Sequence, residues 1–205
     1  GSRVPLSFLK ANPAQAALKQ LRAGWTGSRT YEVAYRIELS QVRLVPLHCQ
    51  VKPTTTMQGS RTQPFLARNP FVVNTQQPAV TALSASDTLI TDSLAGQQFH
   101  LEARFAEPMD TTVMPAFRMA TGATLQPDSS QSTWQDKQTY RMSYHINDQQ
   151  VTRQEVRVNL SGAYDEGGNS LKAYDTAGLF SIAMSNPSIV SHELKQATLN
   201  SDDQG

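Results

Sequence analysis

Alternating apolar and polar residues mark the clearest elements of this chain. Residues 134–146, WQDKQTYRMSYHI, place Tyr, Met, Tyr and Ile at every second position, and residues 25–37, WTGSRTYEVAYRI, do so with Tyr, Val, Tyr and Ile. Successive side chains of a strand point to opposite faces, so this period of two predicts two half-buried strands. Trp, Thr-Tyr, the second Tyr and Ile recur 109 positions apart. The chain therefore contains an internal repeat.

The repeat also suggests where the domains begin and end. The proline segment Gln77–Val80 recurs as Asn186–Ile189 at the same offset, whereas residues 81–113 have no counterpart before residue 3. This pattern is typical of an array of similar modules. We expect a partial module at 3–80 without its opening strands, a complete module at 81–190, and the start of a further module or a tail at 191–205.

One segment of the first copy predicts a helix instead of a strand. Asn12 can serve as the N-cap, Pro13 as the first helical residue and Gly24 as the terminator, which predicts a short helix over residues 13–23. The matching residues 121–133 are rich in Gly, Pro and Ser and predict a loop or irregular edge. A sandwich without a central strand exposes apolar surface and an open sheet edge. We expect the helix, the second module or a neighbouring chain to cover that surface.

Short alternating strands at regular spacing, joined by turn-rich links, predict an all-β fold of two packed antiparallel sheets. Three segments resemble bacterial Ig-like domains: FAEPMD at 105–110, the strand at 134–146, and GAYDEGGN at 162–169. The resemblance covers residues 81–190 and part of 3–80. It implies tandem Ig-like antiparallel β-sandwiches, the first incomplete and carrying the short helix.

The resemblance also implies a role. Such domains form tandem repeats in surface adhesins, S-layer proteins and large secreted proteins, so we expect a non-catalytic structural or adhesion module of a secreted or cell-surface bacterial protein. It would act as a spacer or interaction surface, with neighbouring Ig-like modules and a surface protein or glycan as partners. No nucleophile motif, P-loop or dinucleotide fingerprint is present, so we expect neither an enzyme nor a cofactor.

Composition adds two limits. A single cysteine, Cys49, excludes an internal disulfide framework and a multi-cysteine metal site. Cys49 aligns with Ala163 in the repeat, so we expect it to be a small buried residue. No apolar run is long enough to span a bilayer, and we therefore expect no membrane insertion of this segment.

Charge is distributed unevenly. Residues 1–80 carry ten Lys and Arg against two Glu, a net charge of +8, and residues 81–205 carry −7. The spacing of the basic residues favours two modules that attract each other, while the alternative is a module that binds carbohydrate or a polyanion. Tyr31 and Tyr35 lie on the apolar phase of their strand, which argues against nucleic acid. The candidate contacts of the alternative are Arg29, Arg36, Arg43, Arg61 and Arg68.

Two groups of residues raise the question of a metal. Asp165, Glu166 and Asn169 surround two glycines with oxygen ligands that could hold Ca²⁺, but their spacing differs from an EF-hand loop, so a tight turn is favoured. His100 and His145 fall on the polar phase of strands that would be neighbours. No characteristic histidine spacing supports a metal pair, and we expect these side chains to be solvated.

Overall fold

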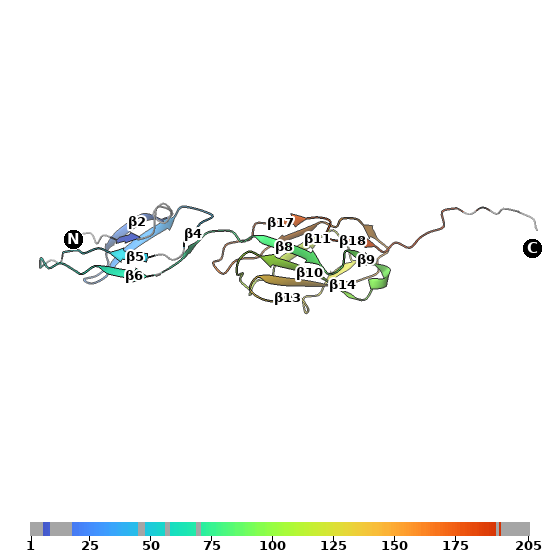
Figure 1. Cartoon of the computed structure of the whole chain (residues 1–205), viewed down its shortest axis with the longest axis horizontal. Coiled ribbons are helices and arrows are strands. Elements are labelled where there is room, and N and C mark those ends of the chain that lie inside the picture. The colour runs from blue at the N-terminus through green and yellow to red at the C-terminus, as the bar shows by residue number, and fades with distance from the viewer. Residues whose placement is uncertain are drawn as a thin grey trace, which may run out of the picture.

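The computed structural model describes residues 6–8, 18–44, 48–55, 58–68, 71–191 and 193. The described part of the chain is all-β, with one 3-10 turn at Asp92–Leu94 and no α-helix. Figure 1 shows the strands gathered into two bodies that follow one another along the chain. We call the described residues up to Asn74 the first unit, and residues 80–184 the second unit.

The strands of the two units are short. The first unit comprises β1 (Leu6–Phe8), β2 (Leu18–Trp25), β3 (Tyr31–Ile37), β4 (Arg43–Leu44), β5 (His48–Val51), β6 (Phe65–Arg68) and β7 (Val73–Asn74). The second unit comprises β8 (Val80–Ala85), β9 (Leu89–Thr91), β10 (Gln98–Phe105), β11 (Ala116–Met119), β12 (Leu125–Pro127), β13 (Thr133–Trp134), β14 (Thr139–Ile146), β15 (Thr152–Arg153), β16 (Val158–Ser161), β17 (Tyr174–Thr176) and β18 (Ser181–Ala183).

In the second unit, β10 is the central strand of the largest sheet, whose order is β12-β14-β10-β8 with β13 also on β14. Apart from the parallel pairing of β9 with β18, every strand pair in this unit is antiparallel. Two further sheets, β11-β16-β17 and β15-β18-β9, supply the opposite layer. Several antiparallel sheets packed around one core confirm the all-β prediction and are consistent with a β-sandwich.

The alternating side chains of β10 and β14 form the centre of that core. Phe99 and Leu101 are fully buried, and Tyr140 and Tyr144 are 1% and 2% exposed. Phe99 lies opposite Tyr144 in the ladder. On the far side Phe180 of the segment before β18 packs on Phe99, with ring centres 4.7 Å apart. The period of two read from the sequence therefore corresponds to one buried face.

The first unit repeats most of these strand pairings. The order β1-β5-β6 matches β11-β16-β17, the pair β2-β3 matches β14 with β12 and β13, and the pair β4-β7 matches β15-β18. Trp25 pairs with Tyr31 as Trp134 pairs with Tyr140. Among the described strands of the first unit, none takes the place of β8, β9 or β10. The edges of β3 and β7 that would receive them carry no described strand.

The helix expected over residues 13–23 is wrong for its described part. Residues 18–25 form β2, in which Leu18 pairs with Ile37 and Trp25 with Tyr31, while residues 13–17 lie outside the described residues. The ladder with β3 and the Trp25–Tyr31 ring contact, 5.2 Å between centres, provide a partner that local capping signals cannot anticipate. The loop expected over 121–133 contains the short strands β12 and β13.

Apolar side chains of the first unit are left exposed. Ile37 is 50% exposed, whereas Ile146 at the equivalent position of β14 is 1% exposed. Of the three covers expected from the sequence, the helix is replaced by a strand over residues 18–23, and the second module stays a prediction. A neighbouring chain stays a prediction. Other large apolar side chains of this unit more than 40% exposed are Leu21, Trp25, Phe65, Phe71 and Val72.

This contrast predicts a difference between two equivalent isoleucines. Ile146→Ala should lower the free energy of unfolding by about 2–5 kcal/mol, because it leaves a cavity in a closed core. Ile37→Ala, the matched control, should change it by no more than about 0.5 kcal/mol, because that side chain is already solvated. Denaturant unfolding followed by circular dichroism measures both. Equal losses would contradict the assignment of an open first unit.

Candidate functional site

The turn at residues 164–169 joins the two units through one carboxylate. The backbone N–H of Asp165 donates to the carbonyl of Asn169, and Gly168 closes the turn with a φ of +81°. That conformation favours glycine because it has no Cβ. Asp165 is only 2% exposed, so the turn holds its carboxylate inside the protein.

Three N–H groups donate to this carboxylate. The backbone N–H of Asn169 lies 2.7 Å from Oδ1, and the Asn169 side-chain amide lies 2.8 Å from Oδ2. The third donor is the side chain of Asn74 in β7 of the first unit, 2.9 Å from Oδ2. A buried carboxylate is costly unless its oxygens are paired, and these donors satisfy it. We call Asn74, Asp165 and Asn169 the junction cluster.

The junction cluster overlaps the calcium candidate without reproducing it. Asp165 and Asn169 come together, but Asn169 presents its amide N–H to the carboxylate. Glu166 faces outward, where its carboxylate accepts a 2.6 Å bond from Lys137 Nζ. In the described part of the chain, no group of three His, Cys, Asp or Glu residues is placed to hold a metal ion. Calcium binding here stays a prediction that nothing in the geometry favours.

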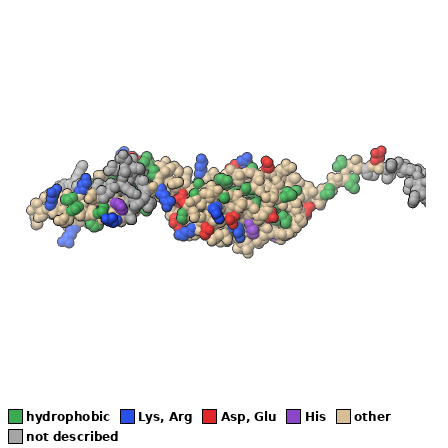
Figure 2. Space-filling model, in the orientation of Figure 1, with side chains coloured by type: hydrophobic (Ala, Val, Ile, Leu, Met, Phe, Trp, Pro, Cys, Tyr) green, Lys and Arg blue, Asp and Glu red, His purple; other side chains and the backbone are tan. Residues whose placement is uncertain are grey.

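The candidate arginines are exposed and dispersed. Figure 2 shows basic side chains scattered along the first unit on the visible face, without a single cluster. Lys19 and Arg22 are paired with Glu38 and Glu32. By contrast, none of the five candidates forms an ion pair with a described carboxylate. They are Arg29 in the β2–β3 turn, Arg36 in β3, Arg43 in β4, Arg61 in the loop before β6, and Arg68 in β6.

A cleft opens between the two sheets of the first unit. It has a volume of about 420 Å³ and is lined by Trp25, Tyr31 and Val33 on the β2–β3 side and by Val51 on the β5 side. Arg29 lies at it as well, so one of the candidate arginines lines a cavity. In the second unit the equivalent Trp134 packs against Phe105, with ring centres 5.5 Å apart.

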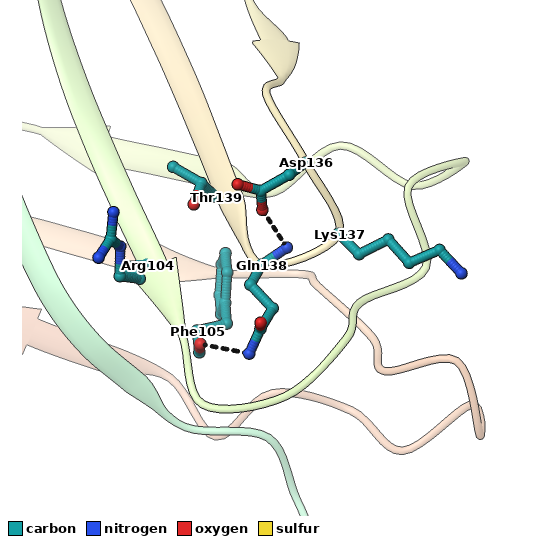
Figure 3. A pocket seen from close by; sticks show the side chains of 6 residues that line it. All are labelled: Arg104, Phe105, Asp136, Lys137, Gln138 and Thr139. Atoms are coloured by element: carbon teal, nitrogen blue, oxygen red, sulfur yellow. Dashed lines mark hydrogen bonds between the residues drawn. The ribbon is translucent and has the colours of Figure 1, made fainter.

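A second cavity, of about 560 Å³, lies at the hairpin between β13 and β14 (Figure 3). Its polar groups are used by the turn itself. The Gln138 backbone N–H donates to Asp136 at 2.6 Å, and the Gln138 side chain donates to the carbonyl of Phe105. Lys137 points away from the cavity in Figure 3. This arrangement closes the turn between the two strands.

The histidines and the cysteine take ordinary positions in strands. His145 is exposed, as expected, whereas His100 is half-buried, with its Nδ1 3.0 Å from Ser143 Oγ across the β10–β14 pair. Cys49 in β5 lies opposite Phe8 as Leu160 lies opposite Phe117, so its expected alignment with Ala163 is wrong. It is half-buried rather than fully buried, and this burial raises the pKa of its thiol. A raised pKa keeps the thiol protonated and unreactive at neutral pH.

Comparisons of the chain with protein-family models, with curated proteins and with solved structures find no match. The described residues contain no helix that is both long enough and apolar enough to cross a membrane.

The junction cluster predicts that two substitutions have different effects. Asp165→Ala should cost about 1–3 kcal/mol of unfolding free energy, because it leaves donors of the turn without an acceptor. Asn74→Ala should leave the second unit folded but free its orientation relative to the first. Small-angle X-ray scattering should then show a broader distribution of dimensions. Unchanged scattering for Asn74→Ala, with Asn147→Ala as the control within one unit, would contradict the junction.

A further prediction concerns acid. The backbone N–H of Gln138 lowers the pKa of Asp136 below its ordinary value of 3.8. A lowered native pKa contributes stability above that ordinary value, and this contribution is lost as the pH falls through the native pKa. Thermal unfolding of the Asp136→Ala variant should therefore differ from the original chain at neutral pH and converge with it once the pH has fallen below the lowered native pKa. A constant difference across the acid range would contradict this role.

Proposed function

We propose that the chain is a non-catalytic structural and adhesion module of a secreted or cell-surface bacterial protein, built from tandem Ig-like sandwiches at 3–80 and 81–190. The observation that carries the proposal is the strand order of the second unit, which recurs among the described strands of the first unit without counterparts of β8, β9 and β10. Repeated modules in series are typical of spacers that hold an interaction surface away from its anchor.

The path of the chain through the second unit suits a load-bearing role. The chain enters at β8 and leaves after β18 at the opposite end of the body (Figure 1). Hydrogen bonds of an antiparallel ladder run perpendicular to the strands, so tension along the strands loads them together in shear. The ladder between β8 and β10 pairs five residues and that between β10 and β14 pairs seven.

The segment that precedes the second unit is restrained, whereas the segment that follows it is exposed. Pro78 is buried and its ring fixes φ, while Asn74 is held by the junction cluster four residues earlier. The equivalent proline after the second unit, Pro187, is exposed, and Ile189 beside it is 88% exposed. The restrained link would limit bending between the modules and so keep a spacer extended.

A second candidate function is binding of a carbohydrate or polyanion by the first unit. It is favoured by the exposure of Arg29, Arg36, Arg43, Arg61 and Arg68, none of which is paired with a described carboxylate. Unpaired surface arginines are free to bind sulfate or carboxylate groups through two parallel hydrogen bonds. Their dispersal is the reason that this function ranks second.

Single-molecule stretching tests the load-bearing proposal. The second unit should unfold in one resolvable event that releases roughly 350–380 Å of chain less its folded length, at about 3.3–3.6 Å per residue. Ile90→Ala, in the buried part of β9, should lower the unfolding force, and Ile37→Ala should leave that event unchanged. Extension of the second unit without a force peak would contradict the proposal.

Heparin chromatography tests the second candidate. A polyanion-binding first unit should be retained at low salt and should elute earlier as ionic strength rises, because salt screens exposed charges. Replacing Arg36 and Arg68 together by Gln should reduce retention, and replacing the paired Arg22 should reduce it less. Passage without retention at low salt would exclude this function.

A further inference from the structure

Two glutamines take an unusual backbone conformation at corresponding places in the two units. Gln41 has a φ of +57° and Gln150 a φ of +49°, and the two positions are separated by 109 residues, the offset of the repeat. A positive φ is uncommon for residues other than glycine, asparagine and aspartate. Such a conformation persists only where the surrounding contacts hold it, so those contacts indicate what the residue does.

In both units the glutamine side chain is bonded to the residue at which the chain leaves the unit. The side-chain carbonyl of Gln41 accepts the backbone N–H of Gln77 at 3.2 Å. In the second unit, the side-chain carbonyl of Gln150 accepts the backbone N–H of Asn186 at 3.0 Å. Gln77 and Asn186 are also 109 positions apart, and each is followed by a proline. We call these two hydrogen bonds the exit clasps.

Further hydrogen bonds hold each glutamine to its own unit. The backbone N–H and the side-chain Nε2 of Gln150 lie 3.3 and 3.0 Å from Asp148 Oδ1, and its backbone carbonyl accepts Ser185 Oγ at 3.4 Å. In the first unit, the backbone N–H of Gln41 donates to the carbonyl of Thr75 at 3.1 Å. The side-chain carbonyl that forms each exit clasp is therefore presented by a residue that is itself fixed in place.

We propose that Gln41 and Gln150 are linker-positioning residues, whose side-chain carbonyls set the direction in which the chain leaves each unit. The clasp fixes the N–H of the residue before the proline. The proline restricts that residue to extended backbone, and its own ring fixes the next φ. Glycine would adopt the positive φ without strain but has no carbonyl to offer, and asparagine is one methylene shorter. Glutamine provides both the acceptor and the reach, although its backbone is strained.

The two exit clasps differ in what supports the chain beyond them. Beyond the first, the link is bonded to the second unit by the junction cluster and by the N–H of Ala106, which donates to the carbonyl of Ala79. Beyond the second, Val190 is 94% exposed, so the effect of one clasp alone is measured most directly at Gln150. This inference rests on the tandem units of the proposed function, but linker order and unfolding force are separate measurements, so either can fail without the other.

Three variants of the full chain test the second exit clasp. Gln150→Gly removes the acceptor and relieves the backbone, whereas Gln150→Asn keeps an amide in a conformation that asparagine adopts readily, but shortens its reach. Gln149→Gly is the matched control, because it adds the same glycine at an exposed neighbouring position. NMR of the isotope-labelled chain measures the exchange of the Asn186 amide with water and the heteronuclear NOE of Asn186 and Ser188, which reports their order.

Both substitutions of Gln150 should raise the exchange rate of the Asn186 amide at least about threefold, because the clasp is lost. They should also lower the heteronuclear NOE of Asn186 and Ser188, while the amide signals of β14 stay unchanged and show that the unit remains folded. Gln149→Gly should leave the exchange rate and the NOE as in the original chain. Original values in both Gln150 variants, a change with glycine but not with asparagine, or an equal change in Gln149→Gly would overturn the proposal.

Discussion

The insertion of β10 between β8 and β14 is the constraint on which the second unit depends. This strand is hydrogen-bonded on both edges, and its inward side chains meet aromatic residues of the opposite layer at Phe180 and of the same sheet at Trp134. Its inward face alternates with polar residues that lie outside, so one strand satisfies backbone pairing and burial together. In the first unit, the described strands lie without a described counterpart of β10. They keep their partners, but their apolar faces stay half-solvated.

A buried polar group of the second unit is also satisfied by hydrogen bonds from backbone and side chains. The buried carboxylate of Asp165 has no cation beside it among the described residues, and three N–H groups take that place. Two of these donors come from its own turn and one from the first unit. The third hydrogen bond therefore forms only when the preceding unit is docked, which links the turn to the orientation of the neighbouring unit. This is a property expected of a spacer and needs no ligand.

Sequence periodicity was sufficient to predict those strands that have one apolar and one polar face. The alternation around Tyr140 and Tyr144 identified β14 and its buried face, and the repeat extended the assignment to β3. The helix prediction was wrong for residues 18–23 because capping signals are local, whereas the partner that makes these residues a strand lies in β3. Composition found Asp165 and Asn169 at a turn, but not Asn74, which is 91 residues away from Asp165. The cleft was missed because it lies between side chains of β2, β3 and β5, which the strand pattern alone does not bring together.

Backbone amide hydrogen exchange compares the two equivalent strands most directly. If β10 decides which strand is protected, every interior amide of β14 should exchange slowly. In β3 the amides bonded to β2 should be protected, and those pointing to the free edge should exchange at rates close to those of an unfolded chain. Uniform and equal protection of β3 and β14 would contradict the account, because it would show that the first unit is closed without such a strand.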